Sequence, residues 1–328
     1  MKAILVKSPG GADQLYLGES SLPEIQNHEI LIRVKAAALN RADILQREGK
    51  YPPPAGASPI LGLDVAGVVE KVGSECKRYQ VGDAVMALLP GGAYAEFASV
   101  DEKLALPIPQ NFSFEEATAL PEVFLTAYQV LFWLGDLKAD QNILIHAGAS
   151  GVGTAAIQLA KLAGASQIFI TAGSEEKIKF CKNLGANEGF NYKQGPWLEW
   201  LQSLTQKKGV KLILDFVAAP YWEQNLKALS SGGKLILIAA QGGVKVENFN
   251  MLPFFTKHLQ VMGSTLRSRS NDYKAKLVHD FSERFFKEFA SGKLKPILYK
   301  TFDWTECAEA HRCMERNENI GKIVLKIS

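Results

Sequence analysis

The stretch that decides the fold is Asn142-Ile-Leu-Ile-His-Ala-Gly-Ala-Ser-Gly-Val-Gly153-Thr-Ala-Ala-Ile-Gln-Leu-Ala-Lys161. An apolar run ending at His146 indicates a buried strand, three glycines follow, and apolar residues then recur at helical spacing from Val152. Glycines between a strand and a helix let the backbone approach a pyrophosphate, which then lies at the helix N-terminus. The spacing is G-x-x-G-x-G rather than the usual G-x-G-x-x-G, but the strand–turn–helix context supports the same function. We therefore predict a dinucleotide turn at Gly148, Gly151 and Gly153.

The end of the next expected strand indicates which dinucleotide binds. It reads Thr171-Ala-Gly-Ser-Glu-Glu-Lys177. NAD sites place a carboxylate about 20 residues after the glycine turn, where it accepts from the ribose 2′-hydroxyl. This strand end has none, whereas Ser174 and Lys177 offer the hydroxyl and the ammonium that a 2′-phosphate needs. Glu175 and Glu176 weigh against a phosphate, although at a helix start they would complement the helix dipole. The sequence favours NADP(H) over NAD(H).

The rest of the chain shows two different patterns of predicted secondary structure. From Pro121 onward, apolar strands alternate with helices, which predicts a parallel sheet covered on both faces. Before residue 121, short strands broken by Gly and Pro predict an irregular antiparallel β domain. The last expected strand, 322–327, has no hairpin partner nearby and should return to that first domain. We expect an α/β protein with residues 1–120 and 267–328 in a β-rich domain and 121–266 in the parallel-sheet domain. Within these, the expected strands are 3–6, 30–38, 65–72, 84–88, 142–146, 168–171, 212–216, 234–238 and 259–264, and the expected helices are 152–162, 175–183, 221–229 and 272–290.

Composition bounds the class of protein. The chain has 328 residues, 47% of them hydrophobic and 22% charged, with a net charge of +3. These values fit two globular domains and argue against a nucleic-acid or membrane polyelectrolyte. The densest basic cluster, 267–276, contains one aromatic residue and is interpreted as a solvated helix start rather than an RNA site. Four cysteines without a paired spacing indicate reduced thiols, and we expect a cytosolic protein.

Several further blocks carry a resemblance to a known family. They are Ala38-Leu-Asn40-Arg-Ala-Asp43, Gly62-Leu-Asp-Val-Ala-Gly67, Met86-Ala-Leu-Leu-Pro-Gly-Gly92, Leu125-Thr-Ala-Tyr128, Gly189-Phe-Asn-Tyr-Lys193 and Asn319-Ile-Gly-Lys-Ile-Val-Leu325. With the glycine turn, they resemble the zinc-independent quinone oxidoreductases of the medium-chain dehydrogenase/reductase superfamily over essentially the whole chain. That resemblance implies a GroES-like catalytic domain, a Rossmann domain, NADPH in the cleft between them, a quinone substrate and a homodimer.

The resemblance also implies the residues that contact the cofactor. The pyrophosphate would lie on the glycine turn, the 2′-phosphoribose around the end of the second strand, and the nicotinamide near residues from both domains. The residues around the pyrophosphate would be Gly148, Ser150, Gly151, Val152 and Gly153. Those around the 2′-phosphoribose would be Gly173, Ser174, Lys177 and Tyr192. Those near the nicotinamide would be Asn40, Thr126, Ala240, Thr265 and Leu266, with Asn317 closing the cleft. Ser150 departs from the family pattern, which often has glycine there, and should stiffen the turn.

No zinc site is expected. Zinc-dependent relatives use a cysteine and a Gly-His-Glu motif where this chain has Asn40 and Gly62-Leu63-Asp64. A catalytic zinc needs three protein ligands, so zinc-assisted alcohol oxidation is excluded at these positions. His146, at the strand end beside the glycine turn, is interpreted as a packing residue, with hydrogen bonding as the alternative.

The chemistry would then come from the dihydronicotinamide, with the protein orienting the acceptor and stabilising charge on its oxygen. Tyr51, in Gly49-Lys-Tyr-Pro-Pro-Pro54, is a candidate phenol donor, although packing on the prolines would account for it equally well. Asn40 is the second candidate, because its amide could bind the ribose or the substrate carbonyl. Reduction of enones or enoyl thioesters is an alternative reaction. An NADPH-regulated RNA-binding or structural role, as in zeta-crystallins, is the alternative of another class.

Overall fold

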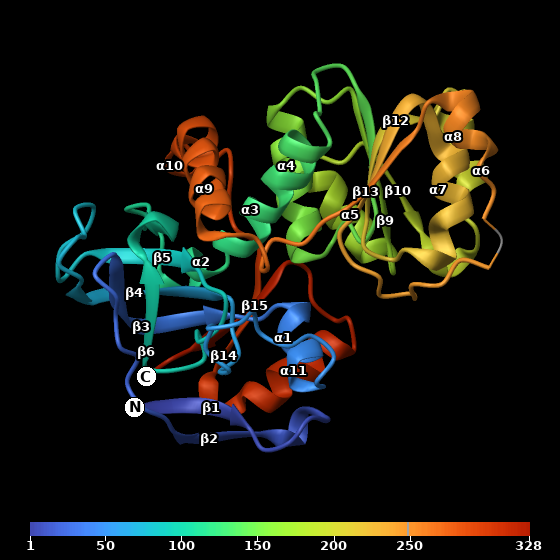
Figure 1. The fold of residues 1–328 in the computed structure, drawn as a ribbon. Helices are drawn as coiled ribbons and strands as arrows, with labels where there is room; N and C mark the ends of the chain where they lie inside the picture. The colour runs from blue at the N-terminus through green and yellow to red at the C-terminus, as the bar shows by residue number, and fades with distance from the viewer. Residues whose placement is uncertain (248) are drawn as a thin grey trace. The chain divides into compact units, whose positions relative to one another are not determined.

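The computed structural model describes residues 1–247 and 249–328, and the chain divides into two compact units. Unit 1 comprises Met1–Leu125 and Leu266–Ser328, and unit 2 comprises Thr126–Thr265. Figure 1 shows a sheet in each unit.

Unit 1 is built on a seven-stranded sheet in the order β14-β15-β3-β4-β5-β7, with β6 also paired to β3, and a separate β1–β2 ribbon. Its pairings are antiparallel except for β14–β15. The C-terminal strand pairs with β3, which confirms the predicted return of the chain end to the first domain. The strands are β1 (Lys2–Val6), β2 (Leu15–Glu19), β3 (Glu29–Ala38), β4 (Asp64–Val72), β5 (Ala84–Leu88), β6 (Phe97–Asp101), β7 (Ala105–Pro107), β14 (Leu298–Asp303) and β15 (Lys322–Lys326).

The helices of unit 1 are short at the N-terminal side and longer near the C-terminus. The expected single helix over 272–290 is wrong in one respect, because it is divided at Phe286 into α9 and α10. The helices of unit 1 are α1 (Arg41–Arg47), α2 (Phe114–Thr118), the start of α3 (Pro121–Tyr128), α9 (Asn271–Phe285), α10 (Lys287–Ala290) and α11 (Cys307–Glu315). Short 3-10 turns lie at Ala12–Gln14, Glu102–Leu104 and Trp304–Glu306.

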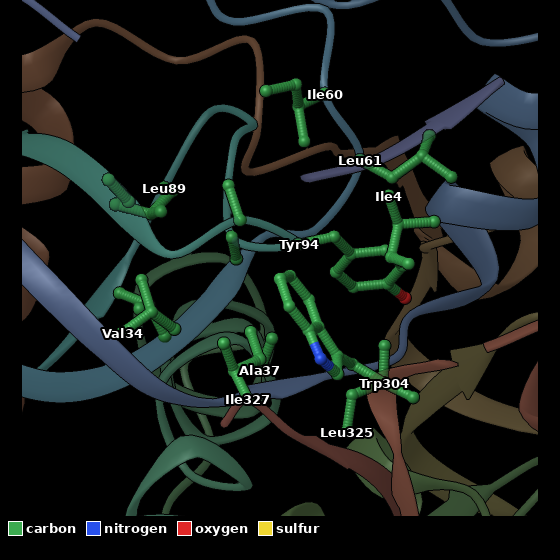
Figure 2. Packing of buried hydrophobic residues seen from close by; sticks show 14 of the residues in the cluster. Ile4, Val34, Ala37, Ile60, Leu61, Leu89, Tyr94, Trp304, Leu325 and Ile327 are labelled. Atoms are coloured by element: carbon green, nitrogen blue, oxygen red, sulfur yellow. The ribbon is translucent and has the colours of Figure 1, made fainter. Parts of the chain in front are cut away.

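The core of unit 1 lies between the sheet, α11 and the loops that follow β3 and β5. Tyr94 and Trp304 are its largest aromatic side chains, 0% and 3% exposed, and aliphatic residues from both chain ends pack around them (Figure 2). Ile4 from the N-terminus and Leu325 and Ile327 from the C-terminus belong to the same cluster. Burial of this apolar surface, at about 25 cal/mol per Å², holds the two separated chain segments of unit 1 together.

Unit 2 is a six-stranded sheet in the order β10-β9-β8-β11-β12-β13, and all its pairings are parallel. This confirms the predicted parallel sheet, with α4 on one face and α6, α7 and α8 on the other (Figure 1). The strand β10 was not predicted, because Gly189 and Asn191 are poor strand formers. The strands are β8 (Asn142–Ile145), β9 (Gln167–Ala172), β10 (Glu188–Asn191), β11 (Val210–Asp215), β12 (Leu229–Leu237) and β13 (Gln260–Gly263). The helices are α4 (Gly151–Leu162), α5 (Glu175–Leu184), α6 (Leu198–Leu204), α7 (Trp222–Ala228) and α8 (Leu252–Lys257), with a π-helix at Gln129–Leu134 and 3-10 turns at Tyr192–Gln194 and Ala219–Tyr221.

One helical run is long and apolar enough to cross a membrane by length and composition alone. It covers Phe114–Leu134, and 78% of its most apolar window is buried inside the protein. Such burial is typical of a core helix, so the run is weak evidence for a membrane span. The charge-free run 141–160, which matches a membrane span in length, forms β8, the glycine turn and most of α4.

Candidate active site

The glycine turn joins β8 to α4 at the carboxyl edge of the parallel sheet of unit 2. Ser150 caps the helix, its Oγ accepting from the Gly153 N–H at 3.1 Å, and the Gly148 N–H donates to the Thr171 carbonyl of β9 at 2.9 Å. A Cβ on Gly153 would lie 2.5 Å from the Ala147 carbonyl oxygen, so only glycine allows this tight turn. The first N–H groups of a helix have no intrahelical acceptors and carry a partial positive charge. The turn therefore fits a pyrophosphate group.

A buried hydrogen-bond chain includes His146, the residue between β8 and the glycine turn. His146, 0% exposed, pairs through Nδ1 with the Thr171 hydroxyl and through Nε2 with Asn225 Oδ1, both at 2.9 Å. Asn225 donates to Asp215 at 2.8 Å, so its Oδ1 must accept the Nε2–H of His146. Burial is the main cause that lowers the His146 pKa, which keeps the ring neutral. His146 thus fixes β8 and β9 in register, so hydrogen bonding as well as packing explains it.

All four residues expected around the 2′-phosphoribose lie around the end of β9. Ser174 caps α5, its Oγ accepting from the Lys177 N–H at 3.3 Å. The Tyr192 hydroxyl lies against Gly173, where an added Cβ would be 2.6 Å from it. Lys177 is half-buried, and its pKa is lowered first by burial and then by the positive charge of Lys193. The charges of Lys177 and Lys193 thus interact at this edge of unit 2, as a site for an anion would require.

Glu175, the residue that weighs against a phosphate here, is engaged elsewhere. Its Oε1 accepts from Asn191 Nδ2 at 3.4 Å and from Gln194 Nε2 at 3.3 Å. Both partners belong to the segment around β10, so the carboxylate is drawn to that segment. The structure therefore weakens the sequence-based objection to a 2′-phosphate.

The remaining expected cofactor residues of unit 2 belong to three different segments of the chain. Thr126 is buried in α3, Ala240 is exposed on the loop after β12, and Thr265 is exposed just after β13. Their role at the nicotinamide stays a prediction.

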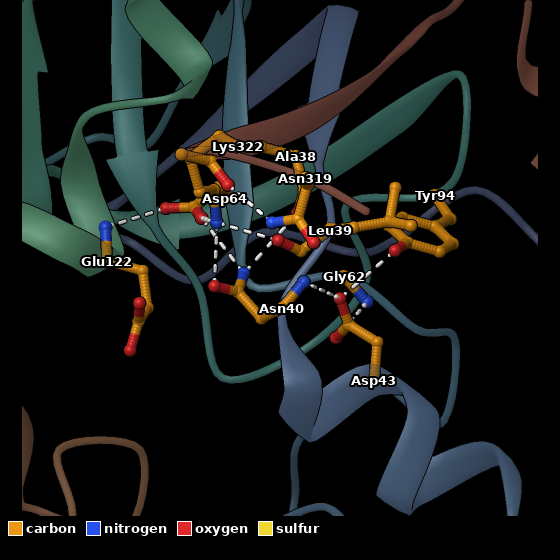
Figure 3. Close-up of polar contacts among 11 residues, drawn as sticks. Ala38, Leu39, Asn40, Asp43, Gly62, Asp64, Tyr94, Glu122, Asn319 and Lys322 are labelled. Atoms are coloured by element: carbon orange, nitrogen blue, oxygen red, sulfur yellow. Dashed lines mark hydrogen bonds and ion pairs between the residues drawn. The ribbon is translucent and has the colours of Figure 1, made fainter. Parts of the chain in front are cut away.

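Unit 1 contains a buried polar network where zinc-dependent relatives would bind metal. Lys322 Nζ donates to Asn40 Oδ1 at 2.7 Å, to the Leu39 carbonyl at 2.8 Å and to Asp64 Oδ2 at 2.8 Å (Figure 3). Asp64 also accepts from Asn40 Nδ2 at 2.9 Å and from the Glu122 N–H at 2.7 Å. Lys322 and Asp64 are 4% and 1% exposed. The ammonium and the carboxylate therefore compensate each other almost without water.

This network narrows what Asn40 can do. Its amide nitrogen donates to Asp64 and to the Ala38 carbonyl at 3.3 Å, which uses both of its hydrogens. Its oxygen accepts from Lys322 and keeps one lone pair. Asn40 can thus accept from a ribose hydroxyl, but it has no hydrogen left to donate to a substrate carbonyl.

A second buried chain begins at Asp43, one helical turn after Asn40. Asp43 accepts from the Asn40 N–H at 2.8 Å and the Tyr94 hydroxyl at 3.0 Å. Tyr94 lies 3.5 Å from His311 Nε2, and His311 Nδ1 lies 3.2 Å from Arg47. Arginine can only donate, so Nδ1 accepts and the ring proton is on Nε2, facing Tyr94. Burial raises the pKa of Asp43 to about 6 and lowers that of His311 to about 3. His311 is therefore a neutral core residue.

The other expected residues of unit 1 lie near these networks. Asn317 accepts from Arg41 at 2.8 Å, and Arg41 directly follows Asn40. Tyr51 is partly exposed on the loop after α1, where its ring faces the Arg267 guanidinium. Leu266, next to Arg267, is 6% exposed and packs inside unit 1.

Sequence reasoning missed two features of unit 1. No role was predicted for Lys322, which belongs to the block Asn319–Leu325. The cluster 267–276 is only partly the solvated helix start that was predicted, because Arg267 and Lys274 are 6% and 4% exposed. A signal was present, since Lys274 lies three and four residues before Leu277 and Val278, on the apolar stripe of α9.

Across residues 1–247 and 249–328, no group of three or more His, Cys, Asp or Glu side chains is placed to hold a metal ion. At the positions expected from zinc-dependent relatives, Lys322 provides a positive charge in direct contact with Asp64.

Two family descriptions match separate parts of the chain. Residues 26–110 match the alcohol dehydrogenase GroES-like domain, and residues 151–283 match the zinc-binding dehydrogenase domain. The quinone oxidoreductase of Rattus norvegicus is 29% identical over 99% of this chain and 97% of its own length. These matches confirm the predicted GroES-like and Rossmann fold class.

Solved structures agree over the whole length. An NAD-dependent alcohol dehydrogenase is 32% identical with a TM-score of 0.88, covering 100% of both chains. The Escherichia coli quinone oxidoreductase complexed with NADPH is 29% identical with a TM-score of 0.88, covering 99% of this chain and 100% of its own. The CurK enoyl reductase is 28% identical with a TM-score of 0.89, covering 100% and 99%.

Proposed function

Because the chain belongs to the zinc-independent quinone oxidoreductases of the medium-chain dehydrogenase/reductase superfamily, we propose that it reduces quinones with NADPH, without metal or flavin. It is an oxidoreductase with a Rossmann unit suited to a nicotinamide cofactor. The choice of NADPH and the roles of individual residues are the proposal.

The proposal of NADPH rests on the residues at the end of β9. The strand ends without a carboxylate, Tyr192 closes over Gly173, and Lys177 and Lys193 are close enough for their charges to interact. A ribose 2′-hydroxyl would find no acceptor carboxylate there, whereas a 2′-phosphate would relieve the repulsion between the two ammonium groups. The likeness to an NADPH-bound quinone oxidoreductase supports the same cofactor. The likeness to an NAD-dependent dehydrogenase is the reason to test it.

The chain's own residues would bind and orient the cofactor and handle one proton. NADPH, when bound, supplies a hydride, that is one proton and two electrons, and leaves as NADP⁺. The α4 N-terminus holds the pyrophosphate, with Ser150 and Gly153 fixing the turn. Tyr51 gives its phenolic proton to the oxygen of the reduced quinone, its O–H bond breaks, and the tyrosinate takes a proton back from water. Asn40, held by Lys322 and Asp64, accepts from the ribose rather than donating to the substrate.

The enoyl reductase likeness favours one second candidate, reduction of enones or enoyl thioesters. In that reaction the hydride goes to a β-carbon, so the two activities differ in the acceptor and not in the cofactor. An RNA-binding role has less support, since Arg267 and Lys274 of the basic cluster are buried.

A substrate panel tests the proposal. Steady-state NADPH oxidation is followed with 9,10-phenanthrenequinone, a 2-alkenal and an enoyl-CoA at equal concentrations. We expect kcat/KM to be at least tenfold higher for the quinone. A higher value for the alkenal or the enoyl-CoA would replace quinone reduction with the second candidate.

We also propose a homodimer formed along the edge strand β13. The strand pairs with β12 and ends the described sheet of unit 2, so its outer backbone groups are available for pairing. Leu252 and Phe255, just before it, are 62% and 69% exposed. Light scattering should give twice the mass of 35.9 kDa, and a monomer mass would refute the dimer.

A further inference from the structure

Arg267 is a buried cation, and no carboxylate among residues 1–247 and 249–328 forms an ion pair with it. Its side chain is 6% exposed, with Nε donating to the Pro90 carbonyl at 2.7 Å and Nη2 to Gln46 Oε1 at 2.6 Å. Nη1 is buried and has no hydrogen-bond partner. Burying a charge that lacks an ion-pair partner is costly.

The guanidinium joins three segments of unit 1. Pro90 belongs to the turn after β5, and Gln46 lies on α1 and donates in turn to the Pro59 carbonyl at 2.9 Å. Pro59 is at the end of the loop that begins at Tyr51, and the Tyr51 N–H is fixed to the Leu45 carbonyl of α1 at 3.2 Å. The Tyr51 loop is thus held at both ends by contacts that lead to Arg267 or α1.

The same guanidinium lies over the Tyr51 ring, with its central carbon 5.4 Å from the ring centroid. Lys274 adds a second cation nearby, 4% exposed, with its Nζ 3.4 Å from the Arg267 carbonyl. Burial raises the pKa of the Tyr51 phenol, the charge of Arg267 lowers it, and Glu122 raises it. Arg267 is therefore the group that opposes the other two influences on the phenol.

We propose that Arg267 is a positioning residue for Tyr51, holding the phenol loop in place and stabilising the tyrosinate left after proton donation to the acceptor. This inference rests on the proposed function, in which Tyr51 gives its proton to a quinone oxygen. The phenolic O–H bond breaks, an O–H bond forms on the reduced quinone, and the negative charge that remains on Tyr51 faces the guanidinium until water returns the proton. Acceptors that need an oxygen protonated would depend on Arg267 more than those reduced at carbon.

The direct test is the titration of Tyr51 in the protein without substrate. Protein labelled with 3-fluorotyrosine is titrated by ¹⁹F NMR, and the Tyr51 resonance among the nine tyrosines is assigned by its loss in Tyr51→Phe. Arg267→Gln keeps a donor for the Pro90 carbonyl but removes the charge, and it should raise the Tyr51 pKa by about one unit. Arg267→Lys keeps the charge and should leave the pKa within a few tenths of wild type. Arg269→Met is the matched control, since Arg269 is exposed and stacks on Tyr273 at 4.9 Å instead.

Kinetics give the second readout. Arg267→Gln should lower kcat for the quinone about tenfold, and this loss should disappear when it is made in Tyr51→Phe, because the two residues act as one unit. An unchanged Tyr51 pKa in folded Arg267→Gln, or losses that multiply in the double variant, would overturn the proposal. If Arg267→Gln does not fold, a Tyr51 pKa in Arg267→Lys shifted as far as one unit would overturn it as well. Absence of quinone turnover in wild type would reject the proposed function, while the titration would still decide the coupling.

Discussion

The glycine turn of unit 2 and the buried polar network of unit 1 differ in which groups provide their charge, backbone N–H groups in the turn and side chains in the network. The turn, which we propose holds the pyrophosphate, offers an anion backbone N–H groups and a helix end, all within residues 146–154. The network balances charge with side chains from β4, β15 and the start of α1, which lie as far as 282 residues apart. A site built from backbone groups therefore depends on the absence of side chains, whereas a site built from side chains depends on each partner being present.

The largest expected effect comes from removing one partner of the unit 1 network. Lys322→Met leaves Asp64 buried without its cation and should lower the free energy of unfolding by about 3–5 kcal/mol. Urea denaturation measures it, with Lys326→Met on the same strand as an exposed control. Adding Asp64→Asn to Lys322→Met should recover part of the loss. A loss below about 1 kcal/mol would mean that the ion pair is not needed, and the contrast between the two regions would fail.

The complementary change adds an atom to the backbone site. Gly153→Ala forces a Cβ to within 2.5 Å of the Ala147 carbonyl, so the turn must open. The affinity for NADPH and for NADH should fall together by about thirtyfold, or roughly 2 kcal/mol. Gly263→Ala is the control, since nothing lies within 4 Å of its added Cβ. Equal cofactor affinity in Gly153→Ala, measured by fluorescence titration, would contradict the assignment of the turn.

The buried chain of unit 1 should also make stability depend on pH. The folded pKa of His311 is about 3 against an ordinary 6.5, so its contribution to stability is present above pH 6.5 and is lost as the pH falls toward 3. At pH 5 the loss is about 2 kcal/mol. Asp43, with its pKa raised from 3.8 to about 6, acts oppositely and loses stability as the pH rises through that range. The two effects partly cancel in the wild type.

His311→Gln separates the two groups. Glutamine can accept from Arg47 and donate to Tyr94, so the chain stays connected. Between pH 7.5 and pH 5, the unfolding free energy of the variant relative to wild type should rise by about 2 kcal/mol. Urea curves at the two pH values measure this difference. If this difference in unfolding free energy did not change between the two pH values, the His311 ring would be protonated at pH 5 in the folded protein.

The smallest expected effect concerns a single charge at the end of β9. Lys177→Ala should raise the KM for NADPH by up to about tenfold, or roughly 1.4 kcal/mol, and leave that for NADH unchanged. Gly153→Ala is expected to affect both cofactors, so the pair distinguishes pyrophosphate from 2′-phosphate contacts. Equal effects of Lys177→Ala on the two cofactors would remove the 2′-phosphate assignment.

The same comparison explains what the sequence could reveal. The turn and the end of β9 are local, so residue types and spacing were enough to locate Gly148, Gly153 and Ser174 at the carboxyl edge of a parallel sheet. The partners Asp64 and Lys322 meet only after β4 and β15 have joined the sheet of unit 1, and no spacing links them. Arg267 was interpreted as part of a solvated helix start because the cluster 267–276 contains one aromatic residue. The exposure of Ser268 and Arg269 agrees with that interpretation. The burial of Arg267 itself depends on contacts with α1 and the turn at Pro90.

NADPH oxidation followed by absorbance with an o-quinone, with NADH run beside it, tests the cofactor and the reaction together. Turnover should be rapid with NADPH, and kcat/KM should be at least tenfold lower with NADH. Comparable rates with both cofactors would contradict the 2′-phosphate site, and NADPH binding without quinone turnover would contradict the proposed reaction.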